Sequence, residues 1–274
     1  MAGRLFVVGT PIGNLSDFSK RGLETLESVD FIAAEDTRVT LKLLNRFNIK
    51  KPLVSYYEHN KNDRGQIIID RISDGEDCAI VTDAGMPAIS DPGEQLVFRC
   101  HEEGIEVISV PGPSAVITAL AVSGLPSGRF CFEGFLSVSK KSRFEHLDSL
   151  KKETRTMIFY EAPHKLVTTL KDMLNAFGDR KISICRELTK IHEEIKITSL
   201  CEAVEFYSQN PPKGEFVIVV SGSDPLSNQE TYTLEDAVKI AKDYMSDGLS
   251  ASSAAKSAAV ETGIKKSDIY SRLN

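Results

Sequence analysis

Short apolar runs alternate with longer segments of helical periodicity through the first half of the chain. The apolar runs predict five strands, at 5–8, 31–34, 52–57, 78–83 and 105–110. Amphipathic patterns between them predict helices at 17–29, 40–47, 64–73 and 93–104. Because strands that alternate with helices favour βαβ units, this half is predicted to be a mostly parallel sheet covered on both faces.

The second half has a different pattern. Strands are predicted at 130–136, 155–163, 181–190, 192–200 and 214–222, with only two strong helical stretches, at 141–152 and 164–178. This arrangement predicts an α+β domain with a mixed or largely antiparallel sheet. The Gly/Pro-rich segment 121–129 is typical of a domain connection, and the polar segment 221–233 is typical of a linker.

The last fifty residues form a third part. A helix is predicted at 234–248, followed at 249–273 by a helix, a Gly-containing turn and a second helix, as in a helix-turn-helix. Such a pair can contact nucleic acid or can simply be a small packing pair, and the low content of basic residues favours the second interpretation. The predicted organisation is a domain at 1–120, a domain at 121–224 and a helical tail at 225–274.

Gly, Pro, Asp and Ser concentrate in the segments that follow the five strands of the first half. These segments are GTPIGN at 9–14, EDTR at 35–38, SYYEHN at 55–60, TDAGMPAISDPG at 82–93 and PGPSA at 111–115. Ligands of open α/β sheets bind at the carboxyl ends of the strands. We therefore expect the five loops to form one site.

The loops do not match the common phosphate-binding signatures. Gly9 and Gly13 are spaced G-x-x-x-G, which is neither the dinucleotide pattern nor the P-loop pattern, and by itself is typical of a turn. In the fourth loop, Pro87 and Pro92 restrict the backbone, and Asp83 ends a hydrophobic strand. Asp83 can cap the next helix or hold a cationic group of a ligand, and Ser114 has the position of a plain helix cap.

Composition narrows the class of protein. A formal net charge of −6 argues against strong sequence-blind binding of nucleic acid, although basic clusters at 139–144, 151–155 and 265–266 are either local contacts or solvated helix ends. No run is long enough for a membrane helix, and the first residues are too short for a signal peptide. Five scattered cysteines predict reduced thiols in a cytoplasmic protein, and the spacing of the histidines predicts no metal site.

The motifs together resemble a known family. The blocks GTPIGNLSD, EDTR, SYYEHN, TDAGMPAISDPG, PGPSA, SGL, GFL, YEAPHK and RELTK occur in one order, and the chain resembles the ribosomal RNA small subunit methyltransferase I family from about residue 4 to 221, with a similar tail. This family is a branch of the tetrapyrrole-methylase-like S-adenosylmethionine enzymes. Met86 and Lys165 depart from the usual residues of their blocks but keep size or charge.

The resemblance implies a two-domain tetrapyrrole-methylase-like α/β fold with S-adenosylmethionine in the cleft. The methyl group would go to the ribose 2′-hydroxyl of a cytidine in the decoding region of 16S rRNA, within the small ribosomal subunit. The resemblance also implies a homodimer. Because the sulfonium loses its charge during transfer, we expect main-chain dipoles rather than a strongly anionic pocket to hold the cofactor.

The resemblance assigns roles to residues of the loops. Cofactor contacts are expected from Pro11, Asp83, Ala84, Gly85, Ser114, Ala115, Tyr160 and Leu188. Substrate contacts are expected from Asn14, Glu35, Asp36, Asn60 and Lys165. Catalytic candidates for activating the ribose hydroxyl are Arg38, His59 and Lys190. Each has a structural alternative: Asp36 as a helix cap beside Arg38, His59 as a loop histidine, and Glu187 with Lys190 as an ordinary ion pair.

Two other functions remain open from the sequence. A methylase of a tetrapyrrole or corrin carbon would share the fold and cofactor, but the EDTR and EHN segments are too polar for an apolar macrocycle bowl. A non-catalytic RNA-binding assembly factor would use the C-terminal helices and would not be stabilised by S-adenosylmethionine.

Overall fold

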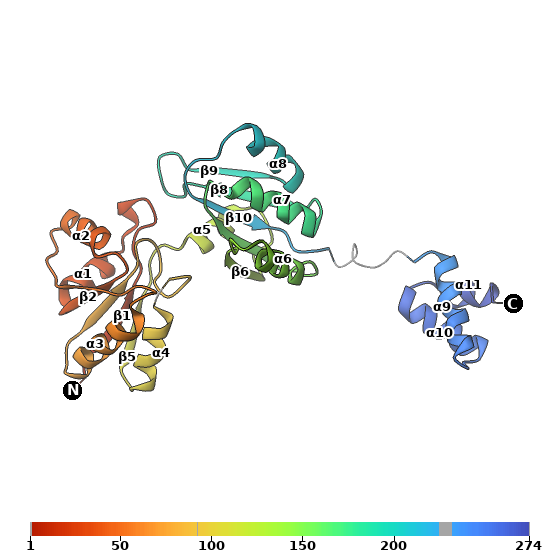
Figure 1. Ribbon diagram of the computed structural model, residues 1–274, viewed down its shortest axis with the longest axis horizontal. Helices are drawn as coiled ribbons and strands as arrows, with labels where there is room; N and C mark the ends of the chain where they lie inside the picture. The colour runs from red at the N-terminus through yellow and green to blue at the C-terminus, as the bar shows by residue number, and fades with distance from the viewer. Residues whose placement is uncertain (1, 92, 225–231, 274) are drawn as a thin grey trace. The chain divides into compact units, whose positions relative to one another are not determined.

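The computed structural model describes residues 2–91, 93–224 and 232–273 (Figure 1). The chain divides into two compact units, one of Met1–Lys151 with Arg155–Ser221 and one of Lys152–Thr154 with Gly222–Asn274. Both predicted sheets therefore lie in the first unit. The proposed start of the tail at 225, most of the expected linker and Pro92 lie outside the described residues, and the predicted domain limits stay predictions.

The first sheet is entirely parallel, as predicted. Its order is β3 (Leu53–Ser55), β2 (Phe31–Ala34), β4 (Cys78–Val81), β1 (Arg4–Val8) and β5 (Glu106–Val110). Every residue of β2 and β4 is buried, which explains why these strands read as continuous apolar runs rather than alternating ones. The carboxyl ends of the five strands share one edge, so the five loops emerge together.

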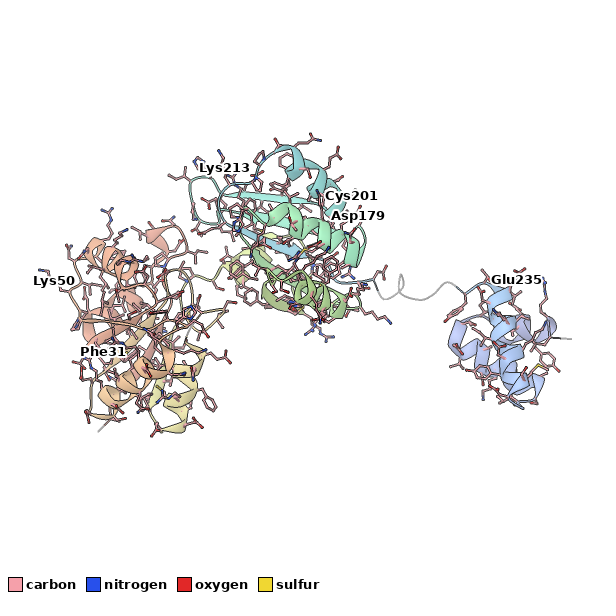
Figure 2. All side chains as sticks on the ribbon, in the orientation of Figure 1. Phe31, Lys50, Asp179, Cys201, Lys213 and Glu235 are labelled. Atoms are coloured by element: carbon pink, nitrogen blue, oxygen red, sulfur yellow. The ribbon has the colours of Figure 1, made fainter. Side chains whose placement is uncertain are left out.

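Helices cover both faces of this sheet. They are α1 (Lys20–Ser28), α2 (Thr37–Arg46), α3 (Lys61–Ser73) and α4 (Glu94–Glu102), with a short 3-10 helix η1 (Leu15–Asp17) after β1. Residues of α3 and α4 pack in one core with Phe31 and Ile80 (Figure 2). Residues of α1 and α2 pack in another core with Ile32 and Ala79. The alternation of side chains along β2 and β4 thus supplies both cores.

The second sheet is mixed, as predicted. Its order is β6 (Phe130–Phe135), β7 (Thr156–Glu161), β10 (Phe216–Val220), β8 (Lys181–Arg186) and β9 (Glu194–Ser199). Only the pair of β6 and β7 is parallel; the other three pairs are antiparallel.

Three helices cover one face of the second sheet, one more than the sequence predicted. They are α6 (Lys140–Ser149), α7 (Leu166–Phe177) and α8 (Leu200–Gln209). The prediction of only two helices is wrong because α8 follows β9 with no intervening loop. Ser199 ends the strand, and its hydroxyl also accepts a hydrogen bond from the backbone N–H of Glu202 to cap the helix.

The other face of the second sheet packs against α5 (Ala115–Val122). Val116, Ala119 and Leu120 of this helix share a core with Val217 and Val219 of β10. Ile12 of the opening loop and Leu188 of the RELTK segment join the same core. The predicted boundary after residue 120 therefore falls inside a helix that begins at the first sheet and packs on the second.

The second unit is a small group of helices with its own core. It contains α9 (Leu234–Ser246), α10 (Ala251–Thr262) and α11 (Lys266–Ser271). Four of its buried positions are Ala237, Ala241, Ala254 and Ala258, and small side chains allow helices to approach closely. Gly263 ends α10 with φ of 72°, which confirms the predicted glycine turn between two helices. A contact of this unit with nucleic acid stays a prediction.

Candidate functional site

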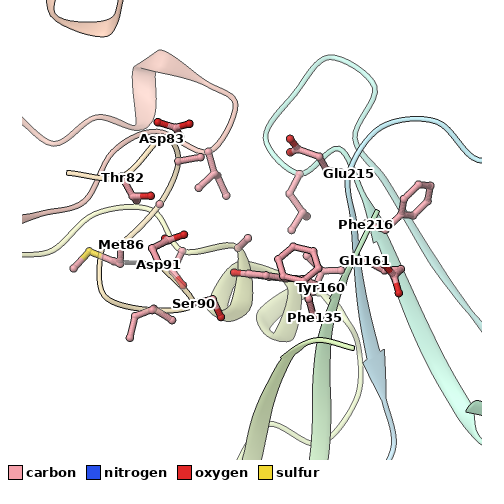
Figure 3. Close-up of a pocket in the computed structure, with 18 of the residues that line it drawn as sticks. Thr82, Asp83, Met86, Ser90, Asp91, Phe135, Tyr160, Glu161, Glu215 and Phe216 are labelled. Atoms are coloured by element: carbon pink, nitrogen blue, oxygen red, sulfur yellow. The ribbon is translucent and has the colours of Figure 1, made fainter. Parts of the chain in front are cut away.

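A cavity of about 460 Å³ lies where loops of the two sheets of the first unit face each other (Figure 3). The loop after β4 and the start of α5 line one side, and residues of β6, β7 and β10 line the other. In Figure 3, Ser90 and Asp91 lie across this space from Tyr160 and Phe135, and the Asp83 carboxylate lies above them. The volume falls within the range of about 300–1,000 Å³ that is typical of small-molecule sites.

The opening loop is held against the neighbouring loops by its backbone. Thr10 N–H donates to the carbonyl of Gly85 at 2.9 Å, and Gly85 N–H donates to the carbonyl of Thr10 at 3.2 Å. A Cβ on Gly9 would lie only 2.7 Å from the Cα of Gly112. The first glycine of GTPIGN therefore permits a close approach of the loops that follow β1 and β5, and the loop forms part of the wall of the site.

The loop after β4 contains two strained residues. Ala88 and Ser90 have φ of 68° and 64°, a left-handed conformation that is uncommon for residues with a side chain. Gly85 of the same loop has φ of 91°. Such conformations persist when the surrounding structure imposes them, and they concentrate at binding sites. The described part of the loop has a defined shape, as Pro87 and the glycines predicted.

Three carboxylates gather on this wall of the cavity. Glu35 Oε2 accepts a hydrogen bond from Thr82 Oγ1 at 2.7 Å, and Asp83 Oδ1 accepts one from the backbone N–H of Asp36 at 3.2 Å. Burial, and then the nearby charge of Glu35, raise the pKa of Asp91 to about 6. The same two causes raise the pKa of Asp83.

The sequence led us to expect main-chain dipoles, rather than a strongly anionic pocket, to hold the cofactor. This wall, with three carboxylates, is more anionic than that. Burial raises both pKa values, so the charged form of each carboxylate is costly at this wall. A ligand with a cationic group would relieve that cost, and S-adenosylmethionine carries a sulfonium and an ammonium. Asp83 does not cap α4; its carboxylate accepts the hydrogen bond from the Asp36 N–H, and a contact with a cationic group stays a prediction.

The opposite wall is aromatic. The ring centroid of Tyr160 lies 4.9 Å from that of Phe132 and 5.4 Å from that of Phe135, both in edge-to-face geometry. Burial raises the pKa of Tyr160 to about 12, so its hydroxyl is neutral at physiological pH. A flat apolar surface opposite an acidic one fits a ligand that has an aromatic ring at one end and a cation at the other. The residues present therefore fit S-adenosylmethionine.

Lys190 is part of a charged group beside the cavity. Its Nζ lies 2.9 Å from Glu187 Oε1 and 2.9 Å from Glu215 Oε2, and Glu215 lines the cavity. Burial lowers the pKa of Lys190, but hydrogen bonds to Glu215 and Glu187 outweigh this effect and raise the pKa overall. The ordinary ion pair that the sequence allowed is present, and it extends to a second carboxylate. Lys190 is thus fixed as a cation.

The EDTR segment supports α2 as well as the site. The Asp36 carboxylate accepts a hydrogen bond from the backbone N–H of Arg38 at 2.8 Å and so caps the helix. Both oxygens of Asp36 also bind the Arg38 guanidinium, which lowers the pKa of Asp36 to about 2. Arg38 is 86% exposed and lies outside the lining of the cavity. The capping alternative for Asp36 is confirmed.

The EHN segment is used to order its own turn. The side-chain oxygen of Asn60 accepts from the backbone N–H of Tyr57 at 2.8 Å, and its amide donates to the carbonyl of Ser55 at 3.2 Å. His59 is exposed, with its ring 6.2 Å from that of Tyr57. Neither His59 nor Asn60 lines the cavity, and their roles toward a substrate stay predictions.

The structure brings most of the expected cofactor residues together. Those that line the cavity are Asp83, Ala84, Gly85, Ser114, Ala115, Tyr160 and Leu188, joined by Glu35 of the expected substrate set. Ser114 is the N-cap residue of α5, as the plain cap interpretation predicted, but its side chain makes no capping hydrogen bond among the described residues, and Ser114 lines the cavity.

The remaining expected residues lie elsewhere. Pro11 lines a second hollow, which also includes Asp83. Asn14 caps η1 by accepting a hydrogen bond from the backbone N–H of Ser16. Lys165 precedes α7 and does not line the cavity. Their binding roles are untested.

Sequence reasoning missed several lining residues. These are Ile12, Met86, Asp91, Phe135, Glu161 and Glu215, among others. Asp91 had a signal, because it lies in the same Gly/Pro-rich loop as Asp83. Glu215 had none, because it precedes an apolar strand far along the chain and reaches the site only through the fold of the second sheet.

The described residues contain neither a metal-binding cluster nor a membrane-spanning helix. No group of three or more His, Cys, Asp or Glu side chains there is arranged to hold a metal ion. Within the same residues, no helix combines the length and the apolar character needed to cross a membrane.

Residues 4–204 match the family described as Tetrapyrrole (Corrin/Porphyrin) Methylases. A Synechocystis protein named Ribosomal RNA small subunit methyltransferase I is 45% identical over 269 residues, which cover 98% of this chain and 96% of the relative. The Bacillus subtilis protein of that name is 43% identical and covers 98% and 93%. The Thermotoga maritima protein of that name is 50% identical over 222 residues, 81% of this chain and all of the relative.

Solved structures agree in fold. The cobalamin biosynthetic enzyme cobalt precorrin-4 methyltransferase has a TM-score of 0.60 at 19% identity and covers 80% of this chain and 94% of its own. Diphthine synthase has a TM-score of 0.61 at 14% identity, covering 80% and 90%. These identities show a shared fold alone and confirm the predicted tetrapyrrole-methylase-like architecture. The full-length matches go further: the chain belongs to the tetrapyrrole methylase family and, within it, to the ribosomal RNA small subunit methyltransferase I family.

Proposed function

We propose that this protein uses S-adenosylmethionine to methylate the ribose 2′-hydroxyl of a cytidine in the decoding region of small-subunit 16S rRNA. One observation above the others supports the general activity, which is methylation of ribosomal RNA with S-adenosylmethionine as donor. Relatives that carry the name Ribosomal RNA small subunit methyltransferase I match the chain over nearly its whole length at 39–47% identity. The choice of ribose, cytidine and decoding region rests on the family resemblance of the loops.

The donor is expected in the cavity between the two sheets. When bound there, it supplies a methyl group that is already activated for in-line displacement by an oxygen nucleophile. Tyr160 and Leu188 offer an apolar surface for its adenine, and the wall with Asp83 and Asp91 offers negative charge for its cationic groups. The task of the protein is then to align the acceptor oxygen with that methyl group.

The acceptor needs a group that takes its proton or stabilises the oxygen as it becomes negative. Lys190 is suited to stabilising developing negative charge, because Glu187 and Glu215 fix its position and keep it protonated. It is poorly suited to accepting the proton for the same reason. Asp83 has a raised pKa and lies at the boundary of two hollows, which suits a proton acceptor.

A homodimer acting in the cytoplasm is part of the proposal. Apolar side chains of α5 and β9 are unusually exposed, with Ile117 at 53% and Ile197 at 52%. A Cβ on Gly124, just after α5, would lie 3.1 Å from Cδ1 of Ile197, so the two elements meet at this surface. A second subunit would cover these residues.

The decisive experiment maps 2′-O-methyl groups. Small-subunit rRNA from cells that lack the protein would be compared with rRNA from cells that regain the wild-type chain or the Lys190→Ala variant. The proposal expects one methylated cytidine to disappear, to return with the wild type and to remain absent with the variant. Methylation of a base, or an unchanged map, would contradict it.

The other two functions give different results in a simple binding test. A non-catalytic assembly factor would not be stabilised against heat by S-adenosylmethionine, whereas a ligand at 100 times its dissociation constant stabilises a protein by about 2.7 kcal/mol. A tetrapyrrole methylase would change the absorbance spectrum of an added porphyrinoid. We expect stabilisation in the first test and no spectral change in the second.

A further inference from the structure

A second hollow of about 400 Å³ lies beside α2 on the first sheet. Its apolar lining, called its floor below, is Pro11, Leu15, Val39 and Leu43, and its basic lining, called its rim below, is Lys42 and Arg46. It has one residue in common with the cavity described above, Asp83. The two hollows are therefore adjacent, and a molecule in the second would reach the boundary where the transfer is proposed to occur.

The charge of α2 sets it apart from the rest of this acidic protein. Arg38, Lys42 and Arg46 are its charged residues, and the helix contains no acidic residue. Each of the other described α-helices that carries a Lys or Arg also carries an Asp or Glu. In the described part of the chain, Lys42 and Arg46 form no ion pair, whereas Arg38 is bound to Asp36. This concentration of unpaired cations contrasts with the net charge of −6.

The three cations lie on one side of the helix. Their i, i+4, i+8 spacing places them within about 80° of arc at 3.6 residues per turn. Val39 and Leu43 follow on the adjacent arc, so a basic stripe runs beside an apolar one. Leu15 and Val39 are exposed at 42% and 37%, although both are apolar and line the hollow.

This combination fits a single-stranded nucleic acid better than a free small metabolite. A strand offers regularly spaced phosphates to the basic stripe and an apolar base or ribose face to the floor. A second protein subunit could also occupy the hollow, because its anionic side chains could pair with the basic stripe. The hollow shares Asp83 with the cavity, however, and this favours the acceptor of the methyl group as the occupant.

We infer that the α2 hollow binds the RNA strand next to the methylated nucleotide. Lys42 and Arg46 contact its phosphates, and Pro11, Leu15 and Val39 receive a flanking base or sugar. The inference rests on the proposed function and adds the surface that holds the substrate. It also places the acidic protein's contact with RNA on α2 rather than on the C-terminal helices or the basic segments at 139–144 and 151–155.

The test compares two double variants that remove the same charge. Lys42→Ala with Arg46→Ala removes the rim of the hollow, and Lys171→Ala with Lys181→Ala removes two exposed lysines of α7 and β8. Binding to small ribosomal subunits from cells that lack the protein is measured by co-sedimentation between about 0.05 and about 0.3 M salt. The Debye length is about 10 Å at 0.1 M salt, so screening of charge contacts increases across this range. Binding of S-adenosylmethionine is measured for each variant by calorimetry.

Each phosphate contact to a single strand contributes about 0.7 to the slope of log affinity against log salt. Loss of two contacts therefore lowers the magnitude of the slope by about 1.4, so the affinity advantage of the wild type over the variant shrinks about 12-fold between about 0.05 and about 0.3 M salt. We expect this for the hollow variant, with unchanged affinity for S-adenosylmethionine, and wild-type slopes for the control variant.

Other results would overturn the inference. Equal slopes for both double variants would show that the hollow does not hold phosphates. A change in oligomeric state by light scattering, with RNA binding unchanged, would assign the hollow to a subunit contact. Because binding is measured without catalysis, wild-type protein that binds with the expected slope but transfers no methyl group would contradict the proposed function and leave this inference standing.

Discussion

Gly9→Ala is the substitution that most directly tests how the loops of the site are held. Gly9 follows β1, and its backbone N–H donates to the carbonyl of Val110 at 3.1 Å at the end of β5. An added Cβ would lie 2.7 Å from the Cα of Gly112 and 2.8 Å from its N. Ordinary contacts of this kind need at least about 3.4 Å, so the strands' ends must separate by several tenths of an ångström.

The expected cost is large because, although the nearest atom, Met86 Sδ at 2.6 Å, belongs to a side chain that can move, the two Gly112 atoms are backbone. Overpacking of a well-packed interior costs typically 1–3 kcal/mol, and a side chain that cannot rotate away gives a value near the upper end, about 3 kcal/mol. For a unit of this size, a loss of about 3 kcal/mol lowers the melting temperature by roughly 6–12 °C. Ser114 and Ala115 lie two and three residues after Gly112 and line the cavity, so affinity for S-adenosylmethionine should fall as well.

Gly128→Ala provides the matched control. Its added Cβ meets nothing within 4 Å, and its backbone lies outside the left-handed region, so the change should be neutral or slightly stabilising. Thermal unfolding of both variants would be followed with and without S-adenosylmethionine. If Gly9→Ala melted within 2 °C (about the effect of 0.5–1 kcal/mol) of the control and bound the donor equally well, the close approach of these loops would not be a constraint on the site.

Three further predictions concern charged groups. For Asp91, burial raises the pKa from 3.8 to about 6 in the folded protein, so the free energy of unfolding should decrease from about pH 4 to about pH 6 and then level off; because Asp91 is only partly buried and solvent screens its charge, the decrease should be about 1–2 kcal/mol. Urea unfolding of Asp91→Asn should lack this decrease, and an identical pH profile would exclude the assigned burial. Lys190→Ala should slow single-turnover methylation of small subunits at least tenfold (about 1.4 kcal/mol) without weakening donor binding, and a wild-type rate would remove Lys190 from the chemistry. Arg143 pairs with Asp172 at 2.7 Å with both side chains 13% exposed, so Arg143→Ala should cost about 3–5 kcal/mol in urea unfolding, whereas a cost below about 1 kcal/mol would indicate a solvated pair.

The fold could be predicted from the sequence where an element is specified by its own local residue pattern. Strands such as 31–34 and 78–81 are short apolar runs between turn residues, and these features are visible without any knowledge of distant contacts. Helix α8 was missed because Ser199 belongs to a strand and a cap at once. A signal was present, since Ser199 and Glu202 have the spacing of a helix start, and the Glu202 N–H donates to the Ser199 hydroxyl.

The residues of the site could be predicted from the sequence only in part. Loops at the ends of parallel strands meet at one edge for topological reasons, so Asp83 and Ser114 could be placed near each other. Which side chains of the second sheet face the cavity depends on its register and on the packing of α5, and neither is encoded in a short motif. Glu215 and Phe135 were missed for that reason. Asn60 of the EHN segment orders its own turn, and its role toward a substrate stays a prediction.

Asp83 stands in the wall between the two hollows, so one carboxylate belongs to both compartments. A cation on one side favours its ionised form, and a phosphate on the other side disfavours it. If donor and RNA occupy these compartments as proposed, the affinity of each depends on the presence of the other, and thermodynamic reciprocity requires the two effects to be equal in size. The order in which the partners arrive then alters the path of the reaction cycle, while the total free energy of forming the ternary complex stays the same.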